Sequence, residues 1–432
     1  MKMVRFISQI MFCFWLLLLS CDRNSPNGNE KIVITYWSAN NQYEINLAEY
    51  LVSEWEKLYP NVHIKHQPIP EGRSSEEVVL AAVVGKTTPD VYSNMWPGDV
   101  ELYVRANALI RLDEFGDYRA FADARYSNDV EKQVQSKNGG VYQILWKTNP
   151  IMMAYNKKIL REAGFFEPPQ TYDEYLRAAA KISQDLDGDG YLDRWMGITQ
   201  IMVTWWQRFF DFYTLYIAAS GGNTLLTDGK IDFNNKAAVE VFRFLQTLFT
   251  HGYFPKEQMD ARADVFIHSV VATRFTGPWS ITQIEKFRSP DFEYDYAPVP
   301  RPADVSGPTF TYGDYKSIVL FKTSKHPDWA WKFAQFLVSR RADLKLLEIA
   351  DQLPLRKNIL EDSLFAPYFK NHPRMVTFAR QAKFVRGADS SPVLREIFDA
   401  ISREFEAAVF YGKKSAEQAI EDAARRAELL LE

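Results

Sequence analysis

The chain has 432 residues, more than a single hydrophobic core usually supports, so we expect two domains. Its formal net charge is −4, and this acidic balance gives no indication of nucleic-acid binding. Aromatic residues make up 15% of the chain, with 11 Trp and 22 Tyr, which suits an aromatic-lined recognition surface.

The N-terminal residues carry the pattern of a signal peptide. Lys2 and Arg5 precede a largely apolar run at 6–19, which is too short for a comfortable membrane span. The sequence Leu-Leu-Ser-Cys at 18–21 follows directly and resembles a bacterial lipobox, in which the cysteine is lipidated and becomes the first mature residue. An ordinary secretory signal with a chance cysteine is the alternative.

The lipobox resemblance implies a lipoprotein signal peptide at 1–20 and an acyl anchor on Cys21. Residues 21–30 are polar and rich in turn formers, so we expect a flexible tether between the lipid and the folded chain. Cys13 would be lost with the signal, which leaves no disulfide in the mature protein. The predicted location is the cell envelope, on the outer face of a bacterial membrane, periplasmic or extracytoplasmic.

Strands and helices alternate at the start of the folded part. The apolar run 32–37 predicts a strand, the polar loop 38–41 follows, and an amphipathic helix ends at Pro60. Residues 62–66 alternate as a second strand, and a capping box formed by Ser74 and Glu77 opens the next helix. This rhythm predicts an α/β fold with a largely parallel sheet.

The stretch 270–280 predicts a strand, a turn and a helix in close succession. Residues 270–275 include three β-branched residues and predict a short strand, Gly-Pro at 277–278 stops it, and Ser280 is placed to cap a helix that begins at Ile281. Trp279 therefore lies in a strand-to-helix turn, where ligands of open α/β sheets bind, and its face could stack on a sugar ring. The alternative is a Trp packed beneath its own loop.

A set of short motifs occurs in the order of one known family. They are Trp37 after the first strand, Pro-Asp-Val at 89–91, Leu-Ile-Arg-Leu-Asp at 109–113, Tyr-Asn-Lys at 155–157 with Ala-Gly at 163–164, Gly-Pro-Trp at 277–279, Ala-Pro-Val-Pro at 297–300, Ser-Lys-His-Pro at 324–327 and Leu-Pro-Leu-Arg at 353–356. The chain thereby resembles the extracellular solute-binding proteins, family 1, the maltose-binding-protein-like receptors of ABC importers. The resemblance implies a two-lobed periplasmic-binding-protein fold of type II, the Venus-flytrap fold, with a hinge between the lobes.

The same resemblance implies lobes made from discontinuous segments. The N-lobe would take 31–147 and 303–350, and the C-lobe would take 148–302 and 351–432. The chain would cross between the lobes near 148–150, near 300–302 and around 351–352. The proline-bearing stretches among these are natural breaks.

An acidic loop follows the spacing of an EF-hand. Asp185, Asp187, Asp189 and Asp193 stand at loop positions one, three, five and nine, and a glycine stands at position six. The twelfth position, which should be a bidentate Glu, is Met196. A structural Ca²⁺ site and an acidic turn without an ion both remain open.

Two adjacent tryptophans lie in an aromatic tract from 203 to 216. Such a tract is most simply a buried helix, but neighbours on a helix point about 100° apart. We therefore expect either Trp205 or Trp206 to reach the cleft.

Other candidate ligand-binding residues share one logic: polar groups stand beside aromatic rings at strand ends, as recognition of a polyhydroxylated ring requires. The full candidate set is Trp37, Ser38, Asn40, Asn94, Trp96, Asp99, Trp146, Lys147, Trp205, Trp206, Trp279, Tyr312, Asp314 and Arg356. Arg356 could bind a ligand hydroxyl or an anion, or it could neutralise a carboxylate within a lobe.

These observations predict a substrate-binding lipoprotein of an ABC importer. Its ligand would be a carbohydrate, expected to be an oligosaccharide, and its partners would be the permease subunits and, through the acyl anchor, the membrane. We expect a monomer with no catalytic residues, no nucleic-acid partner and no required cofactor. The alternatives are a secreted carbohydrate-active hydrolase or lyase, a ligand sensor without a transport role, and a receptor for a polyol phosphate.

Overall fold

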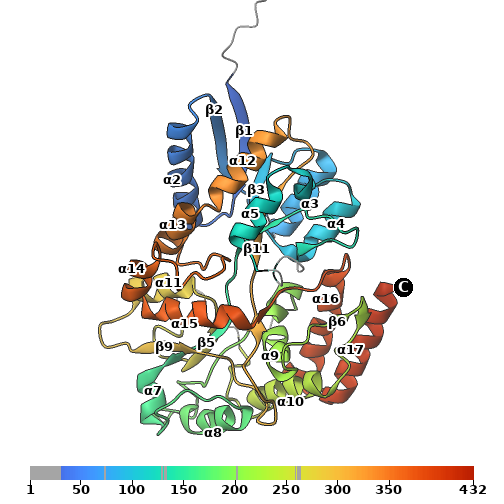
Figure 1. Ribbon diagram of the computed structural model, residues 1–432. Coiled ribbons are helices and arrows are strands. Elements are labelled where there is room, and N and C mark those ends of the chain that lie inside the picture. Colours follow the sequence, from blue (N-terminus) through green and yellow to red (C-terminus); the bar gives the residue numbers. More distant parts are fainter. Residues whose placement is uncertain are drawn as a thin grey trace, which may run out of the picture.

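The described residues form two lobes, each built around its own β-sheet (Figure 1). The computed structural model describes residues 31–72, 74–127, 130, 134–200, 203–257, 259 and 264–432. The predicted signal peptide and the whole predicted tether, with Cys21, lie outside these residues. None of the described helices is both long and apolar enough to cross a membrane.

The N-lobe contains a five-stranded sheet in the order β2-β1-β3-β11-β4. Its strands are β1 (Ile32–Ser38), β2 (Val62–Pro68), β3 (Val91–Met95), β4 (Ile144–Lys147) and β11 (Lys316–Leu320). The prediction of parallel strands is confirmed for β1, β2 and β3, whereas β11 is antiparallel to both β3 and β4. The sheet is therefore completed by a segment that returns from much later in the chain.

Helices cover this sheet from two regions of the sequence. They are α2 (Gln42–Leu58), α3 (Ser75–Gly85), α4 (Val100–Arg105), α5 (Tyr118–Arg125), α12 (Pro327–Leu337) and α13 (Arg340–Ala350), with short 3₁₀ turns η1 (Pro97–Asp99) and η2 (Leu112–Glu114). Helix α2 begins where the Asn41 side chain accepts the backbone N–H of Glu44, and its apolar face buries Leu47, Leu51 and Trp55. The predicted cap at Ser74 is confirmed, since its hydroxyl accepts the backbone N–H of Glu77.

The C-lobe is built on a three-stranded antiparallel sheet in the order β8-β5-β9. These strands are β5 (Met152–Asn156), β8 (Thr273–Thr276) and β9 (Tyr294–Ala297), and two short pairs add β6 (Leu226–Thr227) with β7 (Lys230–Ile231) and β10 (Thr311–Tyr312) with β12 (Val385–Arg386). Its helices are α7 (Lys157–Glu162), α8 (Tyr172–Ile182), α9 (Phe212–Ala219), α10 (Lys236–Thr250), α11 (Ser280–Phe287), α14 (Ala366–Asn371), α15 (Pro373–Gln381), α16 (Leu394–Phe405) and α17 (Ala416–Leu431), with the 3₁₀ turns η3 (Trp205–Phe209) and η4 (Ala382–Phe384) and the π-helical turn η5 (Glu406–Phe410).

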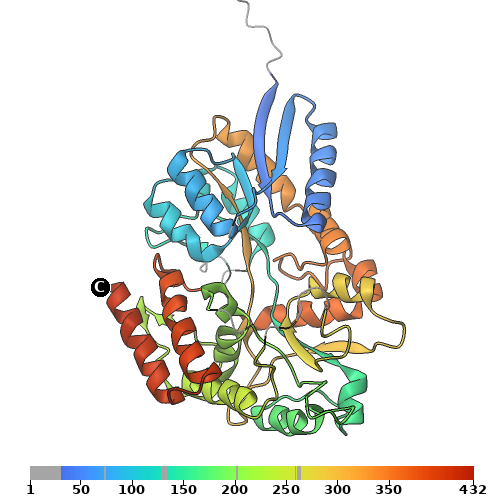
Figure 2. The ribbon, with the colours of Figure 1, turned by 180° about the vertical axis from the view of Figure 1, so that it is seen from behind.

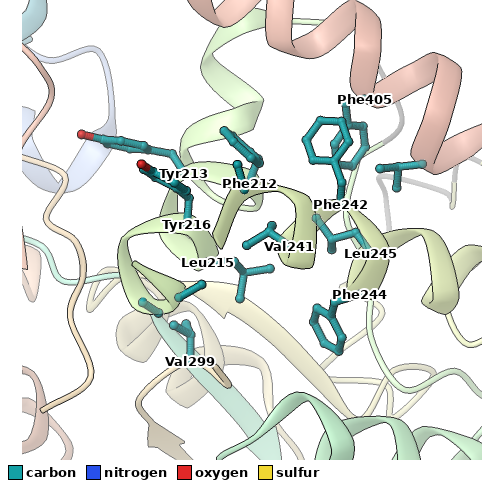
Figure 3. Packing of buried hydrophobic residues seen from close by; sticks show 14 of the residues in the cluster. Phe212, Tyr213, Leu215, Tyr216, Val241, Phe242, Phe244, Leu245, Val299 and Phe405 are labelled. Atoms are coloured by element: carbon teal, nitrogen blue, oxygen red, sulfur yellow. The ribbon is translucent and has the colours of Figure 1, made fainter. Parts of the chain in front are cut away.

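The largest core of the C-lobe forms where α9, α10 and α16 meet (Figure 3). The rings of Phe212 and Phe242 meet at 90° with centroids 5.3 Å apart, and Phe405 packs against Phe242 at 5.9 Å. Every residue of α9 is buried, which explains why the aromatic tract has no polar face. The Trp279 ring packs against this core, whereas the buried face of α11 packs in a separate cluster of the C-lobe.

Three chain segments cross between the lobes side by side, and Figure 2 shows the teal and orange segments running together there. Lys147 bridges to Pro354 and Pro150 bridges to Gly313 in short antiparallel contacts. The backbone N–H of Thr148 donates to the Leu353 carbonyl at 2.9 Å. These segments form the hinge region.

The predicted crossing at 300–302 is wrong in position. Asp304 pairs with Lys236, and the Thr311 hydroxyl donates to the Ile151 carbonyl at 2.6 Å, so residues 303–312 pack on the C-lobe. The crossing follows at 313–315, where β11 is about to begin. After the third crossing the chain first runs along the N-lobe, since the N–H of Leu355 donates to the Trp146 carbonyl at 2.8 Å.

Candidate ligand-binding cleft

A cavity of about 540 Å³ lies between the two lobes. The C-lobe contributes Trp279, Gln283 and Phe287 to its lining, all from the start or body of α11. The N-lobe and the crossing segments contribute Ala39, Asn41, Tyr43, Glu44, Asn94, Lys147, Asn149, Asp314, Lys316, Ala350 and Gln352. Both lobes therefore face the same open cavity, as a ligand-binding cleft requires.

Trp279 stands in the predicted turn between β8 and α11 and is only partly buried. Its ring lies over Gly277, because a Cβ on that glycine would come within 2.1 Å of a ring carbon. The ring of Phe210 meets it edge-on at 6.3 Å. Gly277 thus does more than end the strand, since it makes room for the ring that forms this cavity wall.

The prediction that Ser280 caps the helix is wrong. Trp279 occupies the cap position, with helical dihedral angles and no side-chain cap bond. The Ser280 hydroxyl donates to the Gly277 carbonyl at 2.7 Å and also lies 2.7 Å from the hydroxyl of Tyr296. These buried contacts fix the turn and therefore the position of the tryptophan.

The polar end of the cavity is organised by an ion pair between Lys147 and Glu44. The Lys147 Nζ lies 2.9 Å from the Glu44 carboxylate, and both side chains are buried. Gln352 donates to the same carboxylate at 2.8 Å. Burial alone would raise the pKa of Glu44, but Lys147 and the amides more than offset this and hold it below its ordinary value.

A second ion pair joins Asp314 and Lys316 at 2.9 Å. The Tyr312 hydroxyl donates to Asp314 at 3.3 Å. Burial would lower the pKa of Lys316, but Asp314 and Glu76 raise it above its ordinary value. The cavity therefore holds two lysines and two carboxylates, and their charges cancel.

Trp96, Asp99 and Trp205 lie where the lobes touch. Trp96 follows β3 in the N-lobe but packs into the C-lobe core, with its ring 5.1 Å from Trp205 and 5.3 Å from Phe209. Asp99 bonds through both oxygens to Arg395 of α16, with the Nε contact at 3.0 Å. Burial raises the pKa of Asp99 to about 6, although Arg395 opposes the shift.

Two other predicted aromatic residues sit away from the cavity. Neither Trp205 nor Trp206 lines the cavity: Trp206 is 38% exposed, and Trp205 contacts Trp96 of the other lobe. Trp146 is buried in the N-lobe core, although its neighbour Lys147 faces the cleft. Trp205 and Trp206 lie on the 3₁₀ turn η3, and the helix predicted for this tract begins only at Phe212.

The first predicted loop contributes through different residues from those expected. Trp37 belongs to an N-lobe core cluster, and the Ser38 hydroxyl is engaged by the Ala39 carbonyl and His66. Asn40 is exposed and outside the cavity lining, whereas Asn41 lines it and caps α2. Trp37 and Ser38 hold the loop in place, whereas Ala39 and Asn41 face the cavity.

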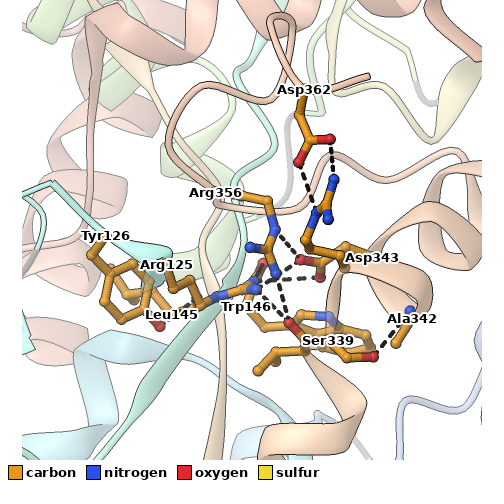
Figure 4. A network of polar contacts seen from close by, with 11 residues as sticks. Arg125, Tyr126, Leu145, Trp146, Ser339, Ala342, Asp343, Arg356 and Asp362 are labelled. Atoms are coloured by element: carbon orange, nitrogen blue, oxygen red, sulfur yellow. Dashed lines mark hydrogen bonds and ion pairs between the residues drawn. The ribbon is translucent and has the colours of Figure 1, made fainter. Parts of the chain in front are cut away.

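Arg356 neutralises a carboxylate within the structure (Figure 4). Its Nε donates to Asp343 at 2.9 Å, and Arg125 donates to the same carboxylate at 2.7 Å. Both arginines also donate to the Val338 carbonyl, at 3.0 and 2.7 Å. Of the two roles considered for Arg356, the geometry supports charge pairing, and this residue does not line the cleft cavity.

The acidic loop folds as a series of tight turns. Carboxylate oxygens of Asp185, Asp187 and Asp193 lie within 4.8 Å of one another, and Asp189 is outside this group. Asp185 accepts the backbone N–H groups of Gly188 and Gly190, which hold its pKa below the ordinary value. Three of the four predicted ligands are thus gathered at one place.

Several cavity residues were missed from sequence. Glu44 had a readable signal, because it falls on the same helical stripe as Leu47, Leu51 and Trp55, and a charged residue on a buried face needs a partner. Gln283 and Phe287 follow Trp279 at helical spacings of four and eight. No sequence pattern indicated Gln352, because the path of the third crossing segment sets its position in the cavity.

Two lobes, three crossing segments and a cavity lined from both sides define a two-lobed solute-binding protein of the periplasmic type. The family described as bacterial extracellular solute-binding protein matches residues 51–377, and the chain belongs to this family. The chain is therefore an extracytoplasmic solute-binding protein with the Venus-flytrap fold.

Relatives and solved structures agree with this assignment. The arabinooligosaccharide-binding protein of Bacillus subtilis is 24% identical over 389 residues, which cover 84% of each chain. The maltodextrin-binding protein MdxE of Bacillus subtilis is 26% identical over 349 residues, which cover 73% of this chain and 74% of that protein. The structure of the sugar-binding protein MalE from Xanthomonas citri matches with a TM-score of 0.76 at 21% identity, over 92% of this chain and 97% of that one.

Proposed function

We propose that the protein is the substrate-binding lipoprotein of an ABC importer and that it binds a carbohydrate, specifically an oligosaccharide, in the cleft. The observation that carries this proposal is the cavity with an aromatic wall at Trp279 facing a polar wall at Lys147 and Glu44. A sugar ring offers C–H groups on its face and hydroxyls at its edge, so it matches both walls at once. The named ligands of the two Bacillus subtilis relatives are consistent with this class.

The charge of the cavity favours a neutral ligand over a polyol phosphate. Lys147 and Lys316 are each paired with a carboxylate, and Arg356 is paired elsewhere. A phosphate would have to separate one of these pairs and leave a buried carboxylate without its partner, which is costly. Hydroxyl groups can join the same network as donors and acceptors without doing so.

The cleft is built to bind a glycan, and we propose no catalytic residue in it. A glycosidase needs a carboxylic acid that stays protonated until it donates its proton. Glu44 has the opposite environment, since its pKa is lowered, and Asp314 is tied to Lys316. This contrast argues against the hydrolase or lyase alternative.

Transport would follow from lobe closure. A ligand that touches both lobes binds the closed state better and shifts the population toward it. The closed monomer, held at the membrane by the acyl group on Cys21, would then deliver the sugar to the permease subunits. Co-purification of the permease with the sugar-loaded protein separates this role from a sensor without transport.

We also propose that Ca²⁺ binds the acidic loop through Asp185, Asp187 and Asp193. The grouping of their oxygens supports this, and the ion would have a structural role because none of the three residues lines the cleft cavity. No other cofactor is required for binding.

A thermal-shift screen of the mature protein tests the proposal. The panel would hold mono- and oligosaccharides and glycerol 3-phosphate, each with Ca²⁺ or with EDTA. A ligand at about 100 times its dissociation constant adds about 2.7 kcal/mol to the free energy of unfolding. We expect a rise in Tm with one oligosaccharide series and a separate rise with Ca²⁺ alone; a response only to glycerol 3-phosphate would contradict the carbohydrate proposal.

A further inference from the structure

The two ends of the cleft differ in this structure. At one end the N-lobe closes onto the C-lobe through Asp99 with Arg395 and through Trp96 with Trp205. At the other end the cavity is bounded by α11, whose last residue is Phe287. A ligand longer than the cavity can extend past α11, where the described residues leave Phe287 exposed.

Phe287 has the properties of a ring without a protein partner. It is 62% exposed although it lines the cavity, and its ring contacts the adjacent Lys286 ammonium, which lies 5.1 Å from the ring centroid. A large apolar side chain facing a binding cavity is more informative than one on an open surface. The ring is available to a ligand that enters the cleft.

Trp279, Gln283 and Phe287 succeed one another along α11 at intervals of four residues. Eight residues of helix correspond to about 12 Å along the axis. One sugar ring cannot reach from the first aromatic residue to the second. A ligand that stacks on both must have at least two rings.

Gln283 supplies a polar contact between the two rings. Its amide nitrogen donates to Asp264 at 2.9 Å, which orients the side chain and leaves the amide oxygen to accept a hydroxyl proton. Asp264 is itself held by Arg274 at 2.8 Å. The helix thus offers an aromatic, a polar and an aromatic contact in line.

We propose that Phe287 is an outer stacking platform and that the ligand is a linear oligosaccharide with one ring on Trp279 and a further ring on Phe287. This inference rests on the proposed carbohydrate function and adds the minimum length of the ligand. It also makes Phe287 the residue that distinguishes longer glycans from monosaccharides.

Calorimetric titration of the mature protein with two homologous series tests this: glucose, maltose and maltotriose, and arabinose with its 1,5-linked di- and trisaccharides. Phe287→Ala should weaken binding of the trisaccharide by about tenfold and leave any monosaccharide binding unchanged. Phe287→Tyr, which keeps the ring face, should restore trisaccharide binding. Phe166→Ala removes another exposed ring, 81% exposed and outside the cavity lining, and should change neither.

The possible failures differ. If the wild-type protein binds a trisaccharide and Phe287→Ala binds it equally well, the platform is wrong and the carbohydrate function stands. If a monosaccharide binds as tightly as its trisaccharide, the inferred length is wrong. If the wild-type protein binds no member of either series but binds a solute that is not a carbohydrate, the inference and the carbohydrate proposal both fail.

Discussion

Two buried carboxylates, Asp343 and Asp99, are each bonded to arginine, but they serve different parts of the molecule. Asp343 lies between Arg125 and Arg356 and ties α5, α13 and the segment after the third crossing into the N-lobe. Asp99 meets Arg395 across the gap between the lobes. The first contact stays in place when the lobes open, whereas the second must break.

An ion pair between aspartate and arginine can thus stabilise one lobe, as at Asp343, or hold the two lobes together, as at Asp99. Asp343 is held by two arginines, and each of these also donates to the Val338 carbonyl. This carboxylate therefore keeps its partners when the lobes move. A carboxylate with one arginine can exchange it for water when the lobes separate. Among the described residues, opening therefore breaks the Asp99–Arg395 ion pair and the contacts of Trp96 with Trp205 and Phe209, and ligand binding can tip this balance.

The largest expected effect comes from breaking the contact within the lobe. Asp343→Asn keeps the shape of the side chain but leaves Arg125 and Arg356 without their carboxylate, so it should destabilise the protein by about 3–5 kcal/mol. Chemical denaturation measures this. Asp362→Asn is the matched control, because Asp362 pairs with the largely exposed Arg340 and its loss should cost about 0–1 kcal/mol. Equal losses would contradict the assigned role of Asp343.

A smaller effect should follow from the pH dependence of the contact between the lobes. Burial in the closed state raises the pKa of Asp99 to about 6 from an ordinary value of 3.8, so the closed state takes up a proton more readily than the open one. Closure is therefore favoured as the pH falls through about 6 and is disfavoured as it rises. Between about pH 7.5 and about pH 5 the closed-to-open ratio should rise roughly tenfold.

Small-angle scattering of the unliganded protein measures this shift as a fall in the radius of gyration. Asp99→Asn removes the titrating group and should abolish the dependence while leaving the fold intact. A radius that rises as the pH falls, or a dependence that survives in Asp99→Asn, would show that another group controls closure.

The sequence was sufficient for the fold because local and global signals agreed. Strand and helix periodicity, the cap at Ser74 and the ordered family motifs all indicated the same two-lobed structure. The position of the second crossing could not be predicted, because residues 303–312 are assigned to a lobe by contacts with Lys236 and Ile151, far away in sequence.

Cleft residues could be predicted only where the local sequence allowed a single position for the side chain. The position of Trp279 followed from its strand-to-helix turn, and Lys147 from its place before a crossing. Trp37 and Trp146 were chosen by the same logic but are buried in the N-lobe cores, since residue type does not reveal which face of a strand is covered. Trp96 and Asp99 depend on how closely the lobes approach, which no local pattern encodes.

Calorimetric titration of Trp279→Ala with the saccharide that gives the largest thermal shift in the wild-type protein tests the assignment of the cleft. We expect binding about tenfold weaker, or about 1.4 kcal/mol, with little change in Tm, because this ring is a partly buried cavity wall at the edge of the C-lobe core. Unchanged affinity would contradict the assignment of the cleft. A loss of stability as large as the loss of binding would place Trp279 in the core instead.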